Sequence, residues 1–351
     1  MSSPLEKAFA LNTLLACKGY DETFISQAVP VPADKVLTAG QKKLLPEVNG
    51  NNKGILNYTN LSVYYNAKRR VPFVAAYNID GSKKATGVKR ANTFRADGRI
   101  AGDCQLSQVG FYDLWKDPAF TEFEIGHMAA NNEMAWGTAA QLQSYQTFHF
   151  PNSVPQAENL NTGIWKSLES YIIKEAATIN NNKRICVFTG PVLQNSDPAY
   201  VKDKKFKIPL LFFKVIVFKT PTGLFSTAFV MSHEERLSEH NMFVKKKGLL
   251  LLAAKTTFFD DFPYKRVFQV NIELLEQLTG MRFKWPGITP IKVPNTKNQV
   301  VRIRKIKDSK DAKKSEETLK KGIVPLSALT ESITTDDHQT AKDYKLNMIL
   351  P

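Results

Sequence analysis

Runs of apolar and β-forming residues, separated by short polar stretches, predict two β-hairpins, which are the clearest elements of the chain. Leu61–Asn66 and Val71–Ile79 are rich in β-branched and aromatic residues and are separated by the polar run 67–70. The second of these runs is apolar enough to be a central strand of a sheet. Further buried strands are predicted at Arg184–Val192 and, as the second hairpin, at Ile208–Phe218 and Gly223–Met231.

Helical spacing is found in two other stretches. Apolar side chains recur from Leu5 to Leu15 and predict a short amphipathic helix that Gly19 ends. A second short helix is predicted over Phe268–Leu278, before Gly280. No apolar run approaches the roughly 18 residues of a membrane span, and the first residues lack the apolar segment of a cleaved signal. We therefore expect a cytoplasmic protein with no membrane partner, although secretion without a cleaved signal stays open.

Changes in composition divide the 351 residues into three parts. Residues 1–54 are expected to form the N-terminal helix and an extension that wraps the surface, and residues 55–288 a single large folded domain. Residues 289–351 are rich in lysine and arginine and poor in aromatic side chains, which predicts a basic, flexible C-terminal tail. The hydrophobic fraction of 43% is that of a globular protein.

The chain carries a large excess of positive charge. It has 48 Lys and Arg against 33 Asp and Glu, a formal net charge of +15. Such an excess suits a polyanion such as nucleic acid or an anionic membrane face, but a soluble basic protein would show it too. Six cations directly precede the histidine segment described next, and they form either a solvated loop or a wall that contacts phosphates. These six are Lys83, Lys84, Lys89, Arg90, Arg95 and Arg99.

Residues 124–169 contain the side chains that hydrolysis of a phosphodiester requires. Such a reaction needs a base for the attacking water and a cation beside the phosphate. The imidazole of His127 is suited to be the base, and the amide oxygen of Asn161 can ligate Mg²⁺. If the following residues are helical, Glu169 lies on roughly the same face as Asn161 and can hydrogen-bond metal-bound water.

Each of these residues also has a structural explanation. A single histidine is often only a buried structural residue, and Asn161 is a suitable helix N-cap. The three cysteines lack the close spacing of a zinc site or a disulfide framework, so they do not change the interpretation. The apolar positions of the segment are expected to be core residues, namely Leu160, Ile164, Trp165 and Leu168.

A set of ordered motifs carries a family resemblance. The motifs are Gly126-His127-Met128-Ala129-Ala130, Thr147-Phe148-His149-Phe150 with Asn152 and Pro155-Gln156, Leu160-Asn161 with Gly163, Trp165 and Leu168-Glu169, and Thr189-Gly190-Pro191. Together they resemble the DNA/RNA non-specific endonucleases, the ββα-metal or His-Me finger nucleases of the endonuclease G type. The resemblance covers roughly residues 19–285 and leaves the basic tail outside.

The resemblance implies an α+β fold with a central antiparallel sheet flanked by helices, in which His127 leaves a β-hairpin and Asn161 lies on the crossing helix. It further implies that His127 activates water, Asn161 holds a single Mg²⁺ for which Mn²⁺ can substitute, Glu169 supports the metal waters and Asn152 arranges the site. The implied activity is sequence-independent cleavage of DNA, and of RNA as a further substrate, that leaves 5′-phosphate ends. The candidate nucleic-acid contacts are Arg69, Arg70, Arg95, Arg99 and Lys166.

One motif position departs from the family pattern. The family has Asp-Arg-Gly-His, whereas this chain has Glu124 and Ile125 before Gly126-His127. An aliphatic chain cannot replace the bidentate guanidinium of arginine. Either another cation takes its place, with Arg95, Arg99 and Lys166 as candidates, or the enzyme is slow, narrow in substrate or dependent on a partner. The alternative function is a catalytically inactive nucleic-acid-binding member of the fold, and a phosphodiesterase for smaller substrates is a third hypothesis.

A cytosolic non-specific nuclease requires control, because it would otherwise attack its own genome. One hypothesis is that the tail from Lys292 onward, or a regulatory or inhibitory partner bound to it, restrains the domain. The competing hypothesis is a tail that only keeps the protein soluble. A homodimer is a further partner hypothesis that the sequence does not decide.

Overall fold

The structure is a computed structural model that describes most of the folded part of the chain. The described residues are 3–32, 37, 39–49, 54–113, 123–157, 160, 165–166, 168–170, 172–173, 184–233, 237, 240–242, 267–292 and 301–302. The predicted metal ligand Asn161 and nearly all of the predicted tail lie outside these residues. Within them, no helix has the length and apolar character needed to cross a membrane.

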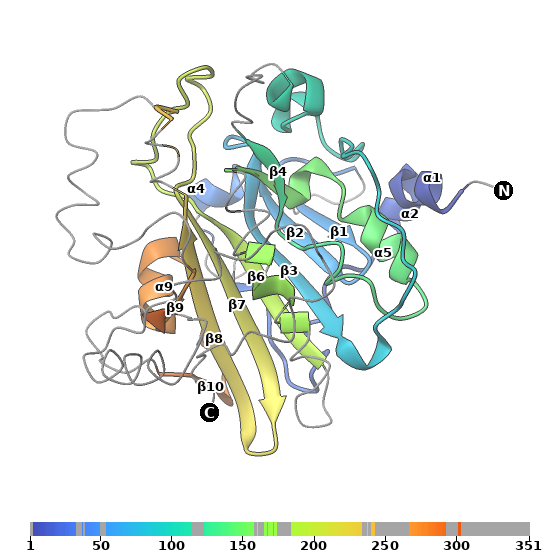
Figure 1. Cartoon of the computed structure of the whole chain (residues 1–351), viewed down its shortest axis with the longest axis vertical. Coiled ribbons are helices and arrows are strands. Elements are labelled where there is room, and N and C mark those ends of the chain that lie inside the picture. Colours follow the sequence, from blue (N-terminus) through green and yellow to red (C-terminus); the bar gives the residue numbers. More distant parts are fainter. Residues whose placement is uncertain are drawn as a thin grey trace, which may run out of the picture.

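A large, mostly antiparallel sheet forms the centre of the fold (Figure 1). Its strands follow the order β1-β2-β3-β6-β7-β8-β9-β11, and β10 pairs in parallel with the first part of β8. The predicted hairpins and the central position of the 71–79 strand are confirmed as β2–β3 and β7–β8. The strands are β1 (Ile55–Tyr58), β2 (Leu61–Asn66), β3 (Val71–Asp80), β6 (Arg184–Val192), β7 (Leu211–Thr220), β8 (Gly223–Ser232), β9 (Val267–Val270), β10 (Ile288–Pro290) and β11 (Val301–Arg302).

Helices lie at both ends of this sheet. In Figure 1, α1 (Pro4–Phe9), α2 (Leu11–Leu15) and α5 (Ala140–Gln146) gather beside β1, while α9 (Ile272–Thr279) packs near β8. The remaining helical elements are short: α4 (Ala39–Lys42), the 3₁₀ turns Gly81–Lys83, Gly102–Cys104 and Phe150–Asn152, and a π-helical turn at Gln108–Tyr112. This mixture of an antiparallel sheet with few helices confirms the α+β class.

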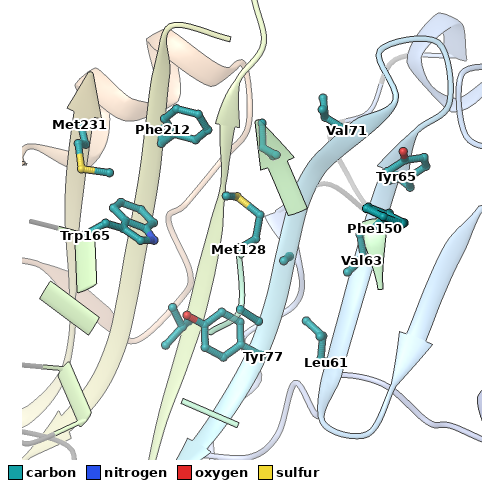
Figure 2. Close-up of a cluster of buried hydrophobic side chains, with 14 of the residues drawn as sticks. Leu61, Val63, Tyr65, Val71, Tyr77, Met128, Phe150, Trp165, Phe212 and Met231 are labelled. Atoms are coloured by element: carbon teal, nitrogen blue, oxygen red, sulfur yellow. The ribbon is translucent and has the colours of Figure 1, made fainter. Parts of the chain in front are cut away.

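Side chains alternate between the two faces of the sheet, and both faces are buried. On β7, Phe212 and Ile216 belong to one core and Phe213 and Val215 to the other. The first core also contains side chains of the segment 123–173, as Figure 2 shows for Met128, Phe150 and Trp165 beside strand residues. The second core is covered by α9 and by residues 20–37. The segment that contains the predicted site therefore packs across one face of the sheet.

Two of the predicted helices differ from the structure. The stretch predicted as one helix near the N-terminus is divided into α1 and α2, because Ala10 is extended (ψ 132°). The helix predicted from Phe268 begins only at Ile272, and the residues before it form β9, whose apolar spacing also suits a short strand. Gly280 does end this helix, in the left-handed conformation (φ 70°) typical of a C-terminal cap.

Close packing at Gly190 gives a stability prediction. A Cβ atom on Gly190 would lie 2.6 Å from the carbonyl oxygen of Phe73 and 3.2 Å from the ring of Phe213. Because neither neighbour can move without disturbing the sheet, we expect Gly190→Ala to lower the free energy of unfolding by about 1–3 kcal/mol. Urea denaturation measures this. Gly98→Ala is the matched control, since its Cβ would meet no atom within 4 Å, and equal midpoints for the two variants would contradict the prediction.

Candidate active site

His127 lies at the end of a short strand that is anchored to a second one. β4 (Glu124–His127) pairs antiparallel with β5 (Ser153–Gln156), so that His127 stands opposite Ser153. The two strands are not the adjacent arms of a tight hairpin, because α5 and the turn before β5 lie between them. Helical residues at 165–166, 168–170 and 172–173 follow this pair, which gives the ββα order that the resemblance implies.

The imidazole of His127 is enclosed by aromatic rings. The rings of Phe94 and Phe148 each lie with their centroids 4.6 Å from the centroid of the imidazole, and only 8% of the residue is exposed. Among the described residues, no group hydrogen-bonds to its Nε2 atom. A buried polar atom without a partner is costly and therefore calls for a functional explanation. Here it leaves a ring nitrogen available to a ligand.

Burial is also what keeps this imidazole neutral. Desolvation, with a smaller contribution from the positive charge of Arg90, lowers the pKa of His127 from 6.5 to about 3. The ring is therefore uncharged at neutral pH and has a lone pair that can accept a proton. This is the protonation state that a general base requires before the reaction.

Asn152 fixes the chain that follows His127. Its side-chain nitrogen donates to the carbonyl oxygens of Ala129 and Thr147, each at 2.9 Å, and its side-chain oxygen accepts from the Ala129 N–H at 3.0 Å. Its carbonyl oxygen also accepts from the Met128 N–H at 2.8 Å. Because the side chain is fully buried and these bonds go to backbone groups, the geometry suits a residue that arranges the site.

Arg90 is the cation whose charge lowers the pKa of His127, and the sequence does not distinguish it from its basic neighbours. Its guanidinium lies 5.2 Å from the centroid of Phe148, on whose ring His127 also packs, and it donates to Asn131 at 3.4 Å. The loop is held by Gln141, whose side chain accepts from the Lys89 N–H (2.9 Å) and donates to its carbonyl oxygen (2.8 Å).

Three of the predicted nucleic-acid contacts form ion pairs within the protein. Arg99 is only 4% exposed and pairs with buried Asp97 at 2.7 Å, so it is not available to a surface ligand. Arg69 pairs with Asp197 at 2.5 Å, and Arg70 with Asp203 at 2.9 Å. Their charges are balanced by carboxylates, which a sequence pattern alone does not reveal.

The other two predicted contacts, Arg95 and Lys166, are exposed. The guanidinium of Arg95 lies 5.0 Å from the ring centroid of Phe9 in α1. The structure does not place it against the imidazole of His127. Lys166 follows the buried Trp165 on the helical stretch after β5.

The departing motif position is occupied by apolar packing. Ile125 is half-buried against the core that covers the sheet, and it stands opposite Pro155. The next residue, Gly126, has no room for a side chain, since a Cβ atom there would lie 2.0 Å from the side-chain oxygen of Gln156. This contact accounts for the glycine of the Gly-His pair.

Glu169 belongs to a buried cluster of charged and polar groups. Its carboxylate lies 3.5 Å from the ammonium of Lys214, which is also 3.0 Å from Glu133. Burial raises the pKa of Glu169 to about 8, against the opposing effect of Lys214 and together with the effect of Glu133. Lys214 and Glu133 were not predicted. A lysine in the middle of the apolar run Phe212–Phe218 does indicate a buried charge that needs a partner.

The residues of the site suit a hard cation held by few protein ligands. Glu169 offers carboxylate oxygens and 12% of its side chain is exposed, so a metal-bound water can reach it. The amide of Asn161 belongs to the same segment but lies outside the described residues. The described part of the chain contains no group of three or more His, Cys, Asp or Glu that could hold a metal. A site with one protein ligand does not require such a group.

Comparison with known proteins found similarity to a family model, to a protein sequence and to solved structures. The family model for DNA/RNA non-specific endonucleases matches residues 41–286. The uncharacterized protein y4fB of Sinorhizobium fredii (strain NBRC 101917 / NGR234) is 28% identical over 229 residues, which are 62% of this chain. The match covers 33% of that relative, so the chain spans about a third of its length. A chain in the crystal structure of the EndoG/EndoGI complex is similar with a TM-score of 0.49 and 19% identity, over 76% of this chain and 98% of that one.

The contact between Arg90 and the histidine pocket predicts a measurable shift in pKa. Removing a positive charge makes protonation of the imidazole less unfavourable, so Arg90→Gln should raise the pKa of His127. Titration of the histidine side-chain signals by NMR measures it. Arg95→Gln is the control, because its charge lowers the pKa of His149 instead. An unchanged pKa of His127 in Arg90→Gln would show that the two groups are not coupled.

Proposed function

This protein belongs to the DNA/RNA non-specific endonuclease family, whose model matches 41–286 of its 351 residues, and we propose that it is a Mg²⁺-dependent endonuclease that cleaves DNA and RNA. The observation that carries the proposal is the buried, neutral imidazole of His127 with an unpaired Nε2 atom. Family membership supports a nuclease, and the pocket supports the way in which the base would work.

In the proposed reaction, Nε2 of His127 accepts a proton from the attacking water. The rings of Phe94 and Phe148 enclose the imidazole and hold it in place. The hydrogen bonds of Asn152 fix the backbone that follows His127. Phosphodiester cleavage then leaves the phosphate on the 5′ end. A base with so low a pKa in the free protein is neutral over the whole physiological range, so its protonation state does not change with pH in that range.

Asn161 would hold the metal ion, with Mn²⁺ able to substitute for Mg²⁺, and Glu169 would hydrogen-bond its water ligands. When bound, the ion supplies positive charge beside the phosphate and the leaving oxygen. The carboxyl group of Glu169 can hydrogen-bond such waters, and a bound cation would favour its ionised form. Its position on the helical stretch after β5 supports this role.

Arg90 is the residue that we propose in place of the motif arginine. It is exposed, it lies against the ring of Phe148 in the histidine pocket, and its charge lowers the pKa of the imidazole. A guanidinium in that place can bind a phosphate oxygen of a substrate whose scissile bond faces His127. Arg95 and Lys166 would contribute charge along the nucleic acid outside the reacting group.

The second candidate is a nucleic-acid-binding protein of the same fold without catalysis. The apolar packing of Ile125, where the family motif has arginine, favours it. It predicts DNA binding that weakens steeply with salt and no cleavage with any divalent metal. Control by the tail after Lys292, by a partner bound to it or through a homodimer stays a prediction. Deleting residues 292–351 and measuring cleavage and toxicity tests the tail.

Removal of the base tests the leading proposal. His127→Ala should lower the rate of plasmid cleavage with Mg²⁺ by about 10²–10⁴-fold, because no other described group occupies that position. EDTA should abolish cleavage by the unmodified protein. Salt-sensitive DNA binding and thermal unfolding of the variant serve as controls for folding. Cleavage at an undiminished rate would exclude His127 as the base.

Removal of the proposed phosphate contact gives a separate test. Arg90→Ala should reduce kcat by about 10²-fold, since a charged donor at the reacting group is lost. Arg184→Ala is the matched control: this arginine is also exposed and lies 5.2 Å from an aromatic ring centroid, that of Phe24, but pairs with Asp80. If the two variants lose activity equally, the positive charge acts in general rather than at the site.

A further inference from the structure

Lys214 is a buried lysine in the middle of a strand whose neighbours are apolar. It lies on β7 between Phe212 and Ile216, on the face of the sheet that the site segment covers, and its side chain has no exposed surface. On one side the residues beside it in the sheet register are small, with Thr189 on β6 and then Ala75 on β3, whereas on the other side it stands beside Phe229 of β8. These small side chains leave the space in which the lysine lies across the sheet.

The ammonium of Lys214 has partners for its three N–H donors. It lies 3.0 Å from the hydroxyl oxygen of Tyr77, 3.0 and 3.2 Å from the two carboxylate oxygens of Glu133, and 3.5 Å from Glu169. The ring of Trp165 adds a cation–π contact at 4.9 Å. Figure 2 shows Tyr77 and Trp165 projecting over the same part of the sheet. A buried ammonium needs such partners, because its desolvation is otherwise very unfavourable.

The two carboxylates of the cluster are held differently. Glu133 is fully buried and accepts hydrogen bonds from the Tyr77 hydroxyl at 2.6 Å and from the Ala130 N–H at 3.1 Å, in addition to Lys214. Glu133 is thus the nearer and more fully hydrogen-bonded carboxylate, and its position is that of the counter-ion of Lys214. Glu169 is farther from the ammonium and is partly exposed, so its carboxyl group can face a cation outside the cluster.

The cluster also connects the two halves of the site. Ala130, which donates to Glu133, follows His127 by three residues, whereas Glu169 lies on the helical stretch after β5. We propose that Lys214, with Glu133 as its counter-ion, is a positioning residue that holds the Glu169 carboxylate in place for metal binding. The inference rests on the proposed function of Glu169.

Glu133→Gln in the full chain tests the role of the counter-ion. The amide keeps the size of the side chain and an acceptor for Ala130, but Lys214 is then left with Glu169 as its only carboxylate. The ammonium should draw Glu169 toward itself and make it less available to a metal. We expect the dissociation constant for Mn²⁺, measured from the EPR signal of the free ion, to rise about tenfold or more. The Mg²⁺ concentration for half-maximal cleavage should rise in parallel.

Glu273→Gln is the matched control. It removes the same charge from an exposed pair with Lys284, on the helix α9 that packs against the other core of the sheet. Its Mn²⁺ affinity should equal that of the unmodified protein. Equal affinities of Glu133→Gln and the control would overturn the inference, as would a loss of thermal stability with unchanged metal affinity.

Tyr77→Phe gives the second variant, which keeps both charges and removes only the hydroxyl that joins Lys214 to Glu133. It should weaken Mn²⁺ binding less than Glu133→Gln does. If Glu133→Gln does not fold, unchanged affinity in Tyr77→Phe overturns the inference. If the unmodified protein binds Mn²⁺ but cuts no DNA, the proposed function is refuted, and the Mn²⁺ affinities of the variants still decide the positioning role. If it binds no Mn²⁺, both proposals are refuted.

Discussion

Burial of both faces of the central sheet is the constraint on which the candidate site depends. Because the strands carry apolar side chains in both directions, each face must be covered by other parts of the chain. The segment with β4 and β5 covers one face through buried residues such as Met128 and Val154. His127 is consequently positioned by the packing of the core and not by a loose loop, and the same packing excludes water from its ring.

That packing also separates two kinds of electrostatics within one site. The pocket of His127 is aromatic, and its dryness keeps the imidazole neutral. The cluster around Lys214 is equally buried, but opposite charges lie within hydrogen-bonding distance and offset the loss of solvent. The neutral base and the ion-paired cluster therefore depend on different surroundings, although both lie on the same face of the sheet.

The sequence predicted the elements whose signals are local. The hairpins β2–β3 and β7–β8 follow from runs of apolar and β-forming residues, whereas the helix predicted over β9 is wrong because four residues do not distinguish the two periods. The pairing of β4 with β5 was not visible in the pattern, since α5 lies between them. The motifs predict roles for His127 and Asn152, whereas the apolar neighbours of Lys214 dominate the pattern of its strand and hide its place beside the site.

The basic residues show most clearly why a pattern of charge is not sufficient. Arg90 and Arg99 belong to one basic stretch of the chain, yet Arg90 is exposed at the histidine pocket and Arg99 is buried in a pair with Asp97. What separates them is the position of a carboxylate and the course of the backbone. Both depend on contacts with distant parts of the chain, such as the bonds of Arg99 to the carbonyl oxygens of Leu14 and Asn57.

The apolar residue at position 125 has a consequence for the base as well as for the substrate. Ile125 and His127 are two residues apart on β4, so their side chains leave the strand on the same face. A guanidinium at 125 would add positive charge on the side of the imidazole and lower its pKa further, since like charge disfavours the protonated ring. With isoleucine at 125, Arg90 is the one cation among the described residues whose charge lowers the pKa of His127. The chain thus separates the cation that would meet the phosphate from the strand that carries the base.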